Sequence, residues 1–489
     1  MLSQKKFRLP SGWTVLQIGI VFVLSFLFSL SVRSQILLEN HSYTDSSVFQ
    51  YVARVILNGG MPYLDTFDHK GPFLYLLNAL GLLISPRFGI WIIELATIFA
   101  AFFLMYKLAC LFCRKITALF VLLSVAAYLL DYLEGGNLVE EYALPFIAGA
   151  LYIFCDYFKN GKITRLRLFL CGACFGAVVL LRINMIAVWL VMCLGVLAQS
   201  LFRRDFKKLG FFLLYFLLGF FAFCGPIIIW LAAGGALPAF FRDYFAFNML
   251  YSANSTSIYS KFYAFWSVLN APSNLIAFFV LAVVCLKKKD LPSVLLLLCF
   301  FVSILSLSIS GHVFKHYRMV LIPVLVIPFA CIGKVGEDGF DKNQFAGLLV
   351  ILYMLVQIVF PSWFSIVEHS MVSIQQRGSS TVDAPIQSIS TWIRENTAPE
   401  DPIIVCGNWN VIYNMSGRFS ASRYSYQTPI GSVDPEIQET FFREIAENKP
   451  KVIVLLSSFF AYDKMLDFIN EYGYTSIPLS DSVYVLPQT

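Results

Sequence analysis

Long apolar runs separated by short polar connections dominate the chain. A membrane-spanning helix needs about 20 predominantly apolar residues, and runs near that length recur throughout the sequence. They lie at about 13–32, 88–112, 116–133, 142–158, 168–181, 183–202, 209–233, 272–286, 291–309, 319–333 and 344–361. The pattern predicts an α-helical polytopic membrane protein with about eleven transmembrane helices.

One apolar segment, Pro72–Ile84, is too short for a regular span. If it crossed the bilayer, four later basic clusters would face outward while Lys5, Lys6 and Arg8 faced inward. Those clusters are Arg114–Lys115, Lys159–Arg167, Arg203–Lys208 and Lys287–Lys289. Because basic residues concentrate in cytoplasmic loops, we expect Pro72–Ile84 to be a helix lying at the outer interface.

This topology places the N-terminus in the cytoplasm and residues 34–87 in a large first external loop. The basic N-terminus and first apolar run resemble a signal peptide. No small-residue cleavage site follows, so we expect a retained first helix. Residues 131–141, 234–271 and 310–318 would form further external loops.

The tail after residue 361 alternates helix-like and strand-like runs. These are Ile386–Glu395, Pro402–Cys406, Glu436–Asn448, Lys451–Leu456, Phe459–Tyr472 and Ser482–Pro487. We therefore expect a transmembrane domain over residues 1–361 and a small extracytoplasmic α/β domain over residues 362–489.

Composition agrees with a membrane protein, since 58% of residues are hydrophobic and only 13% are charged. Soluble domains have roughly 25% charged residues. The net charge of +6 resides largely in short loops, which indicates topology and no nucleic-acid partner. The 11 Cys lie almost entirely in apolar runs, so they predict neither a disulfide framework nor a metal site.

Charged residues in the first external loop predict a site at the membrane surface. Asp45 can remain near the membrane and still act as a general base, or it can cap a helix beginning at Ser46. Asp68, His69 and Lys70 precede Gly71-Pro72. They could line the same cavity or simply form a turn before the interfacial helix.

Three further charged positions lie in the later external regions. Glu140 and Glu141 begin a helix after a glycine-rich turn, and either one could face a cavity or cap the helix. Arg182, between two apolar runs, would need a phosphate, a carboxylate or access to the membrane surface.

A basic cluster in the loop SGHVFKHYR is unexpected outside the membrane and suggests an anionic partner such as a phosphate. Its members are His312, Lys315, His316 and Arg318, with Tyr317 among them. Lipid headgroups are the simpler alternative partner. Zinc binding by the two histidines would lack a third ligand. In the tail, Arg423 and Tyr424 could contact a second substrate.

The chain resembles the GT-C superfamily of polytopic glycosyltransferases, especially bacterial mannosyltransferase and aminoarabinose-transferase-like enzymes. The resemblance is carried by YTDSSVFQYVARVILNGGMPYLDTFDHKGPFLYLLNAL, GGNLVEEYALP, LLRINMI and SGHVFKHYRMVLIP. It implies inverting transfer of a sugar from a polyprenyl-phosphate donor at the outer face of the plasma membrane. It also implies that Asp45 is the base and that Glu140 or Glu141 is the second acidic residue.

By the same resemblance, Arg182, Lys315, His316 and Arg318 would suit the leaving phosphate. Many relatives have Asp-Glu where this chain has Asp45-Ser46, so no cofactor is expected to be required and a divalent metal is not favoured. The expected acceptor is a cell-envelope glycan: a polysaccharide, a teichoic-acid-like polymer or a glycolipid. The alternatives are a lipid-linked sugar flippase or polysaccharide exporter, which needs charges at mid-bilayer, and a non-catalytic scaffold.

Overall fold

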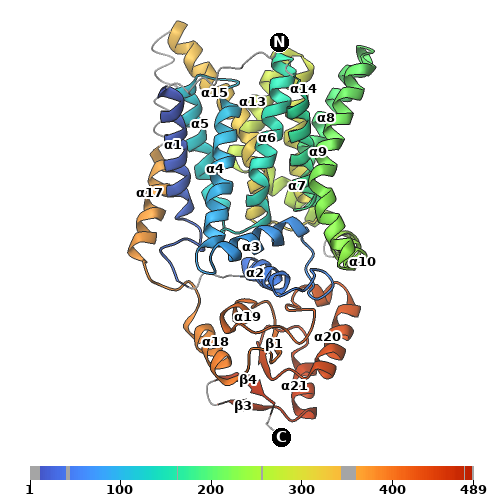
Figure 1. Ribbon diagram of the computed structural model, residues 1–489. Coiled ribbons are helices and arrows are strands. Elements are labelled where there is room, and N and C mark those ends of the chain that lie inside the picture. The colour runs from blue at the N-terminus through green and yellow to red at the C-terminus, as the bar shows by residue number, and fades with distance from the viewer. Residues whose placement is uncertain are drawn as a thin grey trace, which may run out of the picture.

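Figure 1 shows the computed structural model as a long helical bundle with a smaller α/β unit at one end. The structure describes residues 12–39, 44–161, 163–254, 257–342, 360–477 and 480–486. We call the end of the bundle next to the α/β unit the proximal end, and the opposite end the distal end.

The first ten predicted spans each coincide with a helix, whereas residues 344–359 of the last predicted span lie outside the described residues. The ten helices are α1 (Gly12–Ser29), α4 (Gly89–Ala109), α5 (Lys115–Tyr132), α6 (Val139–Asn160), α7 (Arg165–Val179), α8 (Ala187–Phe202), α9 (Phe206–Ala233), α13 (Pro272–Lys288), α14 (Leu291–Ser308) and α15 (Ile322–Lys342). The connection between α9 and α13 holds α10 (Leu237–Phe240), a π-helix (Phe241–Ala246), α11 (Phe247–Asn254) and α12 (Ile258–Leu269).

Five helical stretches within the described ranges are long and apolar enough to cross a membrane: α4, α5, α9, α14 and His316–Gly339. Helices α12 and α13 together make a sixth, with a bend of 78° between them. The chain is therefore a multi-pass membrane protein, and the number of about eleven spans stays a prediction.

Two helices cross the proximal end of the bundle instead of running along it (Figure 1). They are α2 (Thr44–Leu57) and α3 (Pro72–Ile84), and α3 has the bounds that the sequence predicted. A close backbone approach fixes the start of α3, because the Gly71 amide donates to the Leu181 carbonyl at 2.9 Å. A Cβ atom on Gly71 would lie 2.0 Å from the Leu180 oxygen, so only glycine fits there.

The α/β unit is built on a four-stranded sheet in the order β1-β2-β4-β3. Its elements are α18 (Ala384–Asn396), β1 (Ile403–Cys406), α19 (Val411–Ser416), α20 (Pro435–Asn448), β2 (Val452–Leu455), α21 (Tyr462–Glu471), β3 (Thr475–Ile477) and β4 (Ser480–Val485). Strands β1 and β2 are parallel and fully buried, as expected for strands covered on both faces. Ile403 and Val405 pack with residues of α18, while Ile404 and Cys406 pack with residues of α20 and α21.

Helix α2 joins the α/β unit to the bundle. Tyr51 and Val55 of α2 belong to the same buried cluster as Ile403 of the sheet. Arg54 Nη1 donates to the Tyr413 carbonyl at 2.6 Å, and Asn414 Nδ2 donates to the Ser47 carbonyl at 2.9 Å. The two parts therefore meet through a packed interface and direct hydrogen bonds.

Helix α17 (Phe360–Gln375) runs beside α1 in the bundle (Figure 1). Ser370 and Ser373 donate to the carbonyl groups of Leu27 and Leu30, which holds α17 against the end of α1. The α/β elements begin after this helix, at α18. The domain boundary predicted after residue 361 thus falls at the start of α17, and the division of the chain into two domains stays a prediction.

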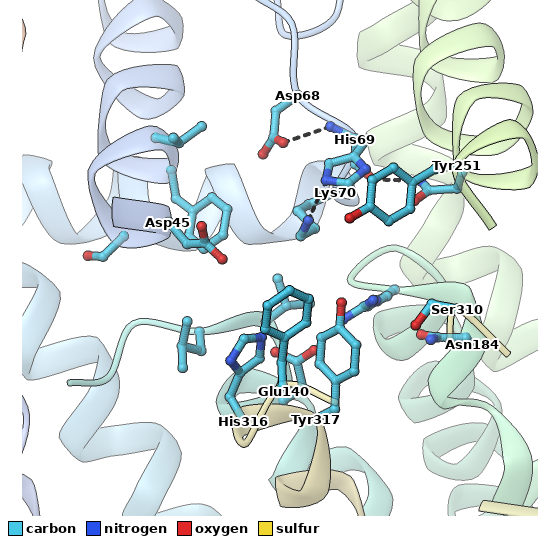
Figure 2. Close-up of a pocket in the computed structure, with 18 of the residues that line it drawn as sticks. Asp45, Asp68, His69, Lys70, Glu140, Asn184, Tyr251, Ser310, His316 and Tyr317 are labelled. Carbon is cyan, nitrogen blue, oxygen red and sulfur yellow. Dashed lines mark hydrogen bonds and ion pairs between the residues drawn. The ribbon is translucent and has the colours of Figure 1, made fainter. Parts of the chain in front are cut away.

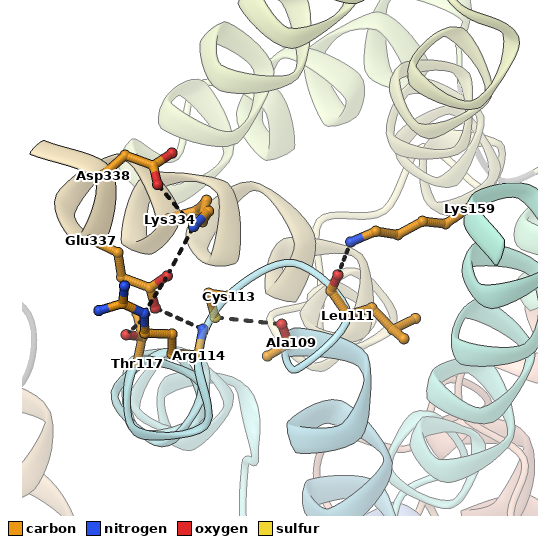
Figure 3. Close-up of polar contacts among 9 residues, drawn as sticks. All are labelled: Ala109, Leu111, Cys113, Arg114, Thr117, Lys159, Lys334, Glu337 and Asp338. Atoms are coloured by element: carbon orange, nitrogen blue, oxygen red, sulfur yellow. Dashed lines mark hydrogen bonds and ion pairs between the residues drawn. The ribbon is translucent and has the colours of Figure 1, made fainter. Parts of the chain in front are cut away.

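At the distal end, a carboxylate of α15 caps the start of α5 (Figure 3). Glu337 Oε1 accepts hydrogen bonds from the Arg114 amide at 2.7 Å and from the Thr117 hydroxyl at 2.6 Å. Lys334 Nζ lies 3.5 Å from Glu337 Oε2. The carboxylate thus accepts from a backbone amide and a side-chain hydroxyl at the start of α5, where a negative charge is favourable.

Candidate functional site

A cavity of about 1100 Å³ lies between the proximal end of the bundle and the α/β unit. Besides Arg33, eight acidic, basic or histidine side chains line it: Asp45, Asp68, His69, Lys70, Glu134, Glu140, Arg182 and His316. Those labelled in Figure 2 lie in two groups that face one another. Asp45 and Asp68–Lys70 form one wall, and Glu140, His316 and Tyr317 form the other.

Asp68 fixes the loop before α3. The Tyr75 and Tyr426 hydroxyls donate to its two carboxylate oxygens, each at 2.8 Å, and the His69 amide donates at 2.7 Å. Since Tyr75 is in α3 and Tyr426 belongs to the α/β unit, this buried carboxylate connects three parts of the chain. Burial raises its pKa, while Lys70 and these hydrogen bonds act in the opposite direction.

His69 and Lys70 project from the same loop. The Lys70 Nζ atom lies 2.6 Å from His69 Nε2, so the imidazole accepts and the ammonium donates. Burial, together with the positive charges of Lys70 and Arg182, holds the pKa of His69 well below its usual value. The imidazole is therefore neutral, and Lys70 also lines the cavity.

On the opposite wall, Arg182 forms an ion pair with Glu140. Its guanidinium also lies 4.2 Å from the centre of the Tyr317 ring. Arg182 follows α7, where the backbone contact with Gly71 brings it near the loop of Lys70. Two cations from distant parts of the sequence thus face one cavity, and each retains donors that could bind an anion.

His316 pairs with Glu134, which is the first of four consecutive residues with positive φ. Glu94 of α4 accepts hydrogen bonds from the Asn137 amide and the Ser34 hydroxyl. A Cβ on Gly136 would lie 2.4 Å from the Glu94 carboxylate, so glycine is needed for this close contact. Glu94 is buried behind the cavity and positions the turn that carries Glu134.

Asp45 lies in the first turn of α2 and lines the cavity, half-buried. Figure 2 shows its carboxylate directed into the space between the two walls. The neighbouring Ser46 hydroxyl accepts a hydrogen bond from Asn137 Nδ2 at 2.8 Å, which fixes this turn against the loop of Glu134. The turn that carries Asp45 is thus held in place, and its carboxylate faces the cavity.

Six residues singled out from the sequence do not line this cavity: Glu141, His312, Lys315, Arg318, Arg423 and Tyr424. Glu141 is fully buried and interacts with Glu94, so Glu140 is the member of the pair that faces the cavity. Lys315 is exposed. Arg318 donates to Ser267 Oγ at 3.0 Å, and the His312 ring lies 5.5 Å from the Tyr251 ring, tilted by 37°.

Arg423 and Tyr424 attach the α/β unit to the bundle. Arg423 pairs with Asp243 and donates to the Tyr63 carbonyl at 2.9 Å. Tyr424 packs against Phe67 with ring centres 5.3 Å apart. Both residues therefore help to dock the α/β unit, and the substrate contact predicted for this pair stays a prediction.

Sequence reasoning missed several cavity residues. Glu134 stands before Gly135-Gly136, and an acidic residue at a glycine-rich turn of a predicted external loop was an available signal. Asn184, Asn408 and Tyr426 gave no comparable signal, because isolated polar residues acquire meaning only when folding brings them to one cavity.

Within the described ranges, no group of three or more His, Cys, Asp or Glu side chains is placed to hold a metal ion. Independence from a metal stays a prediction.

A comparison with protein families identifies the chain. Residues 5–337 match the family described as putative competence-induced protein Ccs4, N-terminal domain. The chain belongs to this family. No curated protein matches the Ccs4-family chain.

Solved structures with the same fold cover nearly the whole Ccs4-family chain. ArnT from Cupriavidus metallidurans in the apo state has a TM-score of 0.62 at 14% identity, covering 97% of this chain and 98% of that one. ArnT bound to undecaprenyl phosphate has a TM-score of 0.60 at 13% identity, covering 98% and 99%.

The archaeal oligosaccharyltransferase AglB from Archaeoglobus fulgidus, in complex with an inhibitory peptide and a dolichol-phosphate, has a TM-score of 0.52 at 12% identity. It covers 90% of this chain and 69% of that one. ArnT and AglB are GT-C proteins, so the Ccs4-family chain has the GT-C fold.

Proposed function

We propose that this protein is an inverting glycosyltransferase that moves a sugar from a polyprenyl-phosphate carrier to a cell-envelope glycan at the outer face of the plasma membrane. The cavity carries the proposal, since it combines an open carboxylate, Asp45, with the cations Lys70 and Arg182. The GT-C proteins of similar fold include ArnT bound to undecaprenyl phosphate and AglB bound to a dolichol-phosphate, which favours a donor of that class.

In the proposed reaction, Asp45 accepts the proton of an acceptor hydroxyl as its oxygen attacks the anomeric carbon. The bond between that carbon and the phosphate oxygen breaks, and the electron pair leaves with the polyprenyl phosphate. Lys70 and Arg182 stabilise the charge that develops on this leaving group. A monophosphate carrier allows fixed cations to do this, so no step is assigned to a divalent metal.

The ion pairs of the cavity wall position these cations. Glu140 orients Arg182, and Glu134 orients His316. Both carboxylates also limit the net positive charge, so that the product phosphate can depart after transfer. His316 adds a donor to the phosphate side of the cavity.

The test is sugar transfer by the purified full chain in detergent, with a panel of polyprenyl-phosphate sugars and either EDTA or added Mg²⁺. We expect release of polyprenyl phosphate that survives EDTA and falls by about 10³-fold in Asp45→Asn, the scale of a lost general base. Asp131→Asn, which removes an exposed carboxylate outside the cavity, is the matched control and should retain activity.

Normal turnover by Asp45→Asn would remove Asp45 as the base. Absence of release from every donor, combined with movement of a lipid-linked sugar across reconstituted vesicles, would replace the transferase by a flippase.

A further inference from the structure

The α/β unit contributes its own wall to the cavity, through Asn408, Tyr426, Pro429 and Ile430. Asn408 follows strand β1 by two residues. Gly407, between them, has φ +137°, a conformation that favours glycine, and it turns the chain out of the sheet. The carboxyl ends of parallel strands are where open α/β sheets bind ligands. The carboxyl end of β1 opens onto the cavity.

The loop that carries Asn408 is held firmly. The Gly407 amide donates to Gln427 Oε1 at 3.0 Å, and the Gln427 amide donates to the Gly407 carbonyl at 3.1 Å. Asn410 Nδ2 donates to the Ser425 hydroxyl at 2.7 Å. The loop therefore presents Asn408 in a fixed position without using its side chain to hold itself together.

The side chain of Asn408 makes no hydrogen bond to any described residue, and its amide oxygen is shielded from solvent. A buried amide oxygen without a hydrogen-bond donor is unfavourable unless a ligand supplies one. Tyr426, on the same wall, donates its hydroxyl hydrogen to Asp68 Oδ1. Its oxygen can still accept a hydrogen bond from a ligand.

The opposite wall offers a similar amide in a different setting. Asn184 Oδ1 is also buried without a hydrogen-bond partner among the described residues. However, Asn184 follows Arg182 closely in the chain and lies on the same side of the cavity as Ser310 and Tyr317 (Figure 2). An amide near a guanidinium suits a sugar attached to a phosphate, whereas the wall of Asn408 contains no charged side chain.

We propose that Asn408 and Tyr426 form an acceptor subsite that binds hydroxyl groups of a carbohydrate. This inference rests on the proposed glycosyltransferase function. Asn408 accepts from one hydroxyl and donates to another, and the Tyr426 oxygen accepts from a third. Pro429 and Ile430 supply the apolar surface against which a sugar ring packs. The α/β unit thus selects the acceptor, while the bundle binds the donor.

The experiment compares Asn408→Ala with Asn184→Ala in the full-length protein, using donors that the wild type turns over. Short N-acetylglucosamine oligosaccharides and glycerol phosphate oligomers serve as acceptor probes. Hydrolysis of the donor without acceptor is measured in parallel. We expect Asn408→Ala to raise the acceptor KM about tenfold, with the donor KM and the hydrolysis rate unchanged. Asn184→Ala should instead raise the donor KM and leave the acceptor KM unchanged.

Asn414→Ala is the control for looser docking of the α/β unit, because Asn414 joins that unit to α2 but does not line the cavity. It should leave both KM values unchanged. An unchanged acceptor KM in Asn408→Ala, or an equal change in Asn414→Ala, would overturn the subsite. If the wild type hydrolysed the donor but transferred its sugar to none of the acceptor probes, carbohydrate would be ruled out as the acceptor. If the wild-type protein turned over none of the donors, the proposed function itself would be overturned.

Discussion

The two ends of the bundle use the same residue types for different purposes. At the distal end, Glu337 meets the Arg114 amide, the Thr117 hydroxyl and Lys334 beside a hollow of about 180 Å³ (Figure 3). At the proximal end, carboxylates and cations surround about 1100 Å³ (Figure 2). The distal carboxylate makes its hydrogen bonds within the fold, where it caps a helix. The proximal groups include Asp45, whose carboxylate faces the cavity, and the amide oxygens of Asn184 and Asn408, which are buried without a hydrogen-bond partner among the described residues.

The difference shows that charge near a membrane surface does not by itself identify a site. A polar side chain whose hydrogen bonds are all made within the fold, as when Glu337 caps α5, contributes to stability. A polar side chain that is held rigid but still lacks hydrogen-bond partners can bind a ligand. Substitutions at the two ends should therefore separate stability from activity.

Among the variants that compare the two ends, the largest effect is expected at the proximal ion pair. Arg182→Gln should lower transfer by about 100-fold, because a cation aimed at the leaving group is lost. It should also lower the free energy of unfolding by about 3 kcal/mol, because Glu140 is left buried and unpaired. Transfer assays and thermal unfolding in detergent measure the two effects.

The double variant Arg182→Gln/Glu140→Gln separates them. We expect it to recover most of the lost stability, since no uncompensated carboxylate remains, but not the activity. Recovery of transfer along with stability would mean that Arg182 acts only by holding the fold together.

At the distal end, Glu337→Ala should reduce the free energy of unfolding by about 1–2 kcal/mol, since two donors at the start of α5 lose their acceptor. The kcat of transfer should not change. Glu337→Gln keeps an acceptor oxygen and should recover part of the stability. A tenfold loss of kcat in a well-folded Glu337→Ala protein would contradict the division between the two ends.

The smallest expected effect is the pH dependence of stability at the proximal end. The pKa of His69 is lowered by burial and by Lys70, so the unfolded chain takes up a proton at a higher pH than the folded chain. His69 therefore contributes stability that is complete above pH 6.5 and is lost as the pH falls below it. The raised pKa of Asp68 acts oppositely, through stability that is lost as the pH rises through its folded value.

Thermal unfolding between pH 7 and pH 5 should thus show a steeper loss for the wild type than for His69→Gln. The distal variant Glu337→Gln should keep the wild-type slope. Equal slopes for wild type and His69→Gln would mean that the histidine titrates as an exposed one.

Much of the fold was predictable because a membrane-spanning helix can be recognised from the residues of its own segment. A run of about 20 apolar residues and the placement of basic loops are both readable from neighbouring positions. For the same reason, the short helix Pro72–Ile84 was predicted with the bounds that it has. The paired strands Ile403–Cys406 and Val452–Leu455 were likewise marked by their apolar, β-branched residues.

The site was predictable only in part. The sequence supplied Asp45, Asp68–Lys70, Arg182 and His316 as charged residues near one membrane surface, and all of them line one cavity. It could not choose between Glu140 and Glu141, because adjacent helical residues point in directions that only packing against Glu94 and Arg182 decides. It also could not reveal that Arg423 pairs with Asp243, which lies 180 positions away.

The sequence by itself thus determined the membrane class, the helix positions and the types of charged group near the proximal surface. These depend on composition over short windows, where hydrophobic burial and helix length act locally. Only the tertiary structure decided which charges pair, which helix end is capped, and that Asn408 and Tyr426 of the α/β unit complete the cavity. Those outcomes depend on contacts between residues that are between about 40 and 360 positions apart, such as Glu140 with Arg182 and Asp68 with Tyr426. Such contacts form only when the helices and the α/β unit pack together.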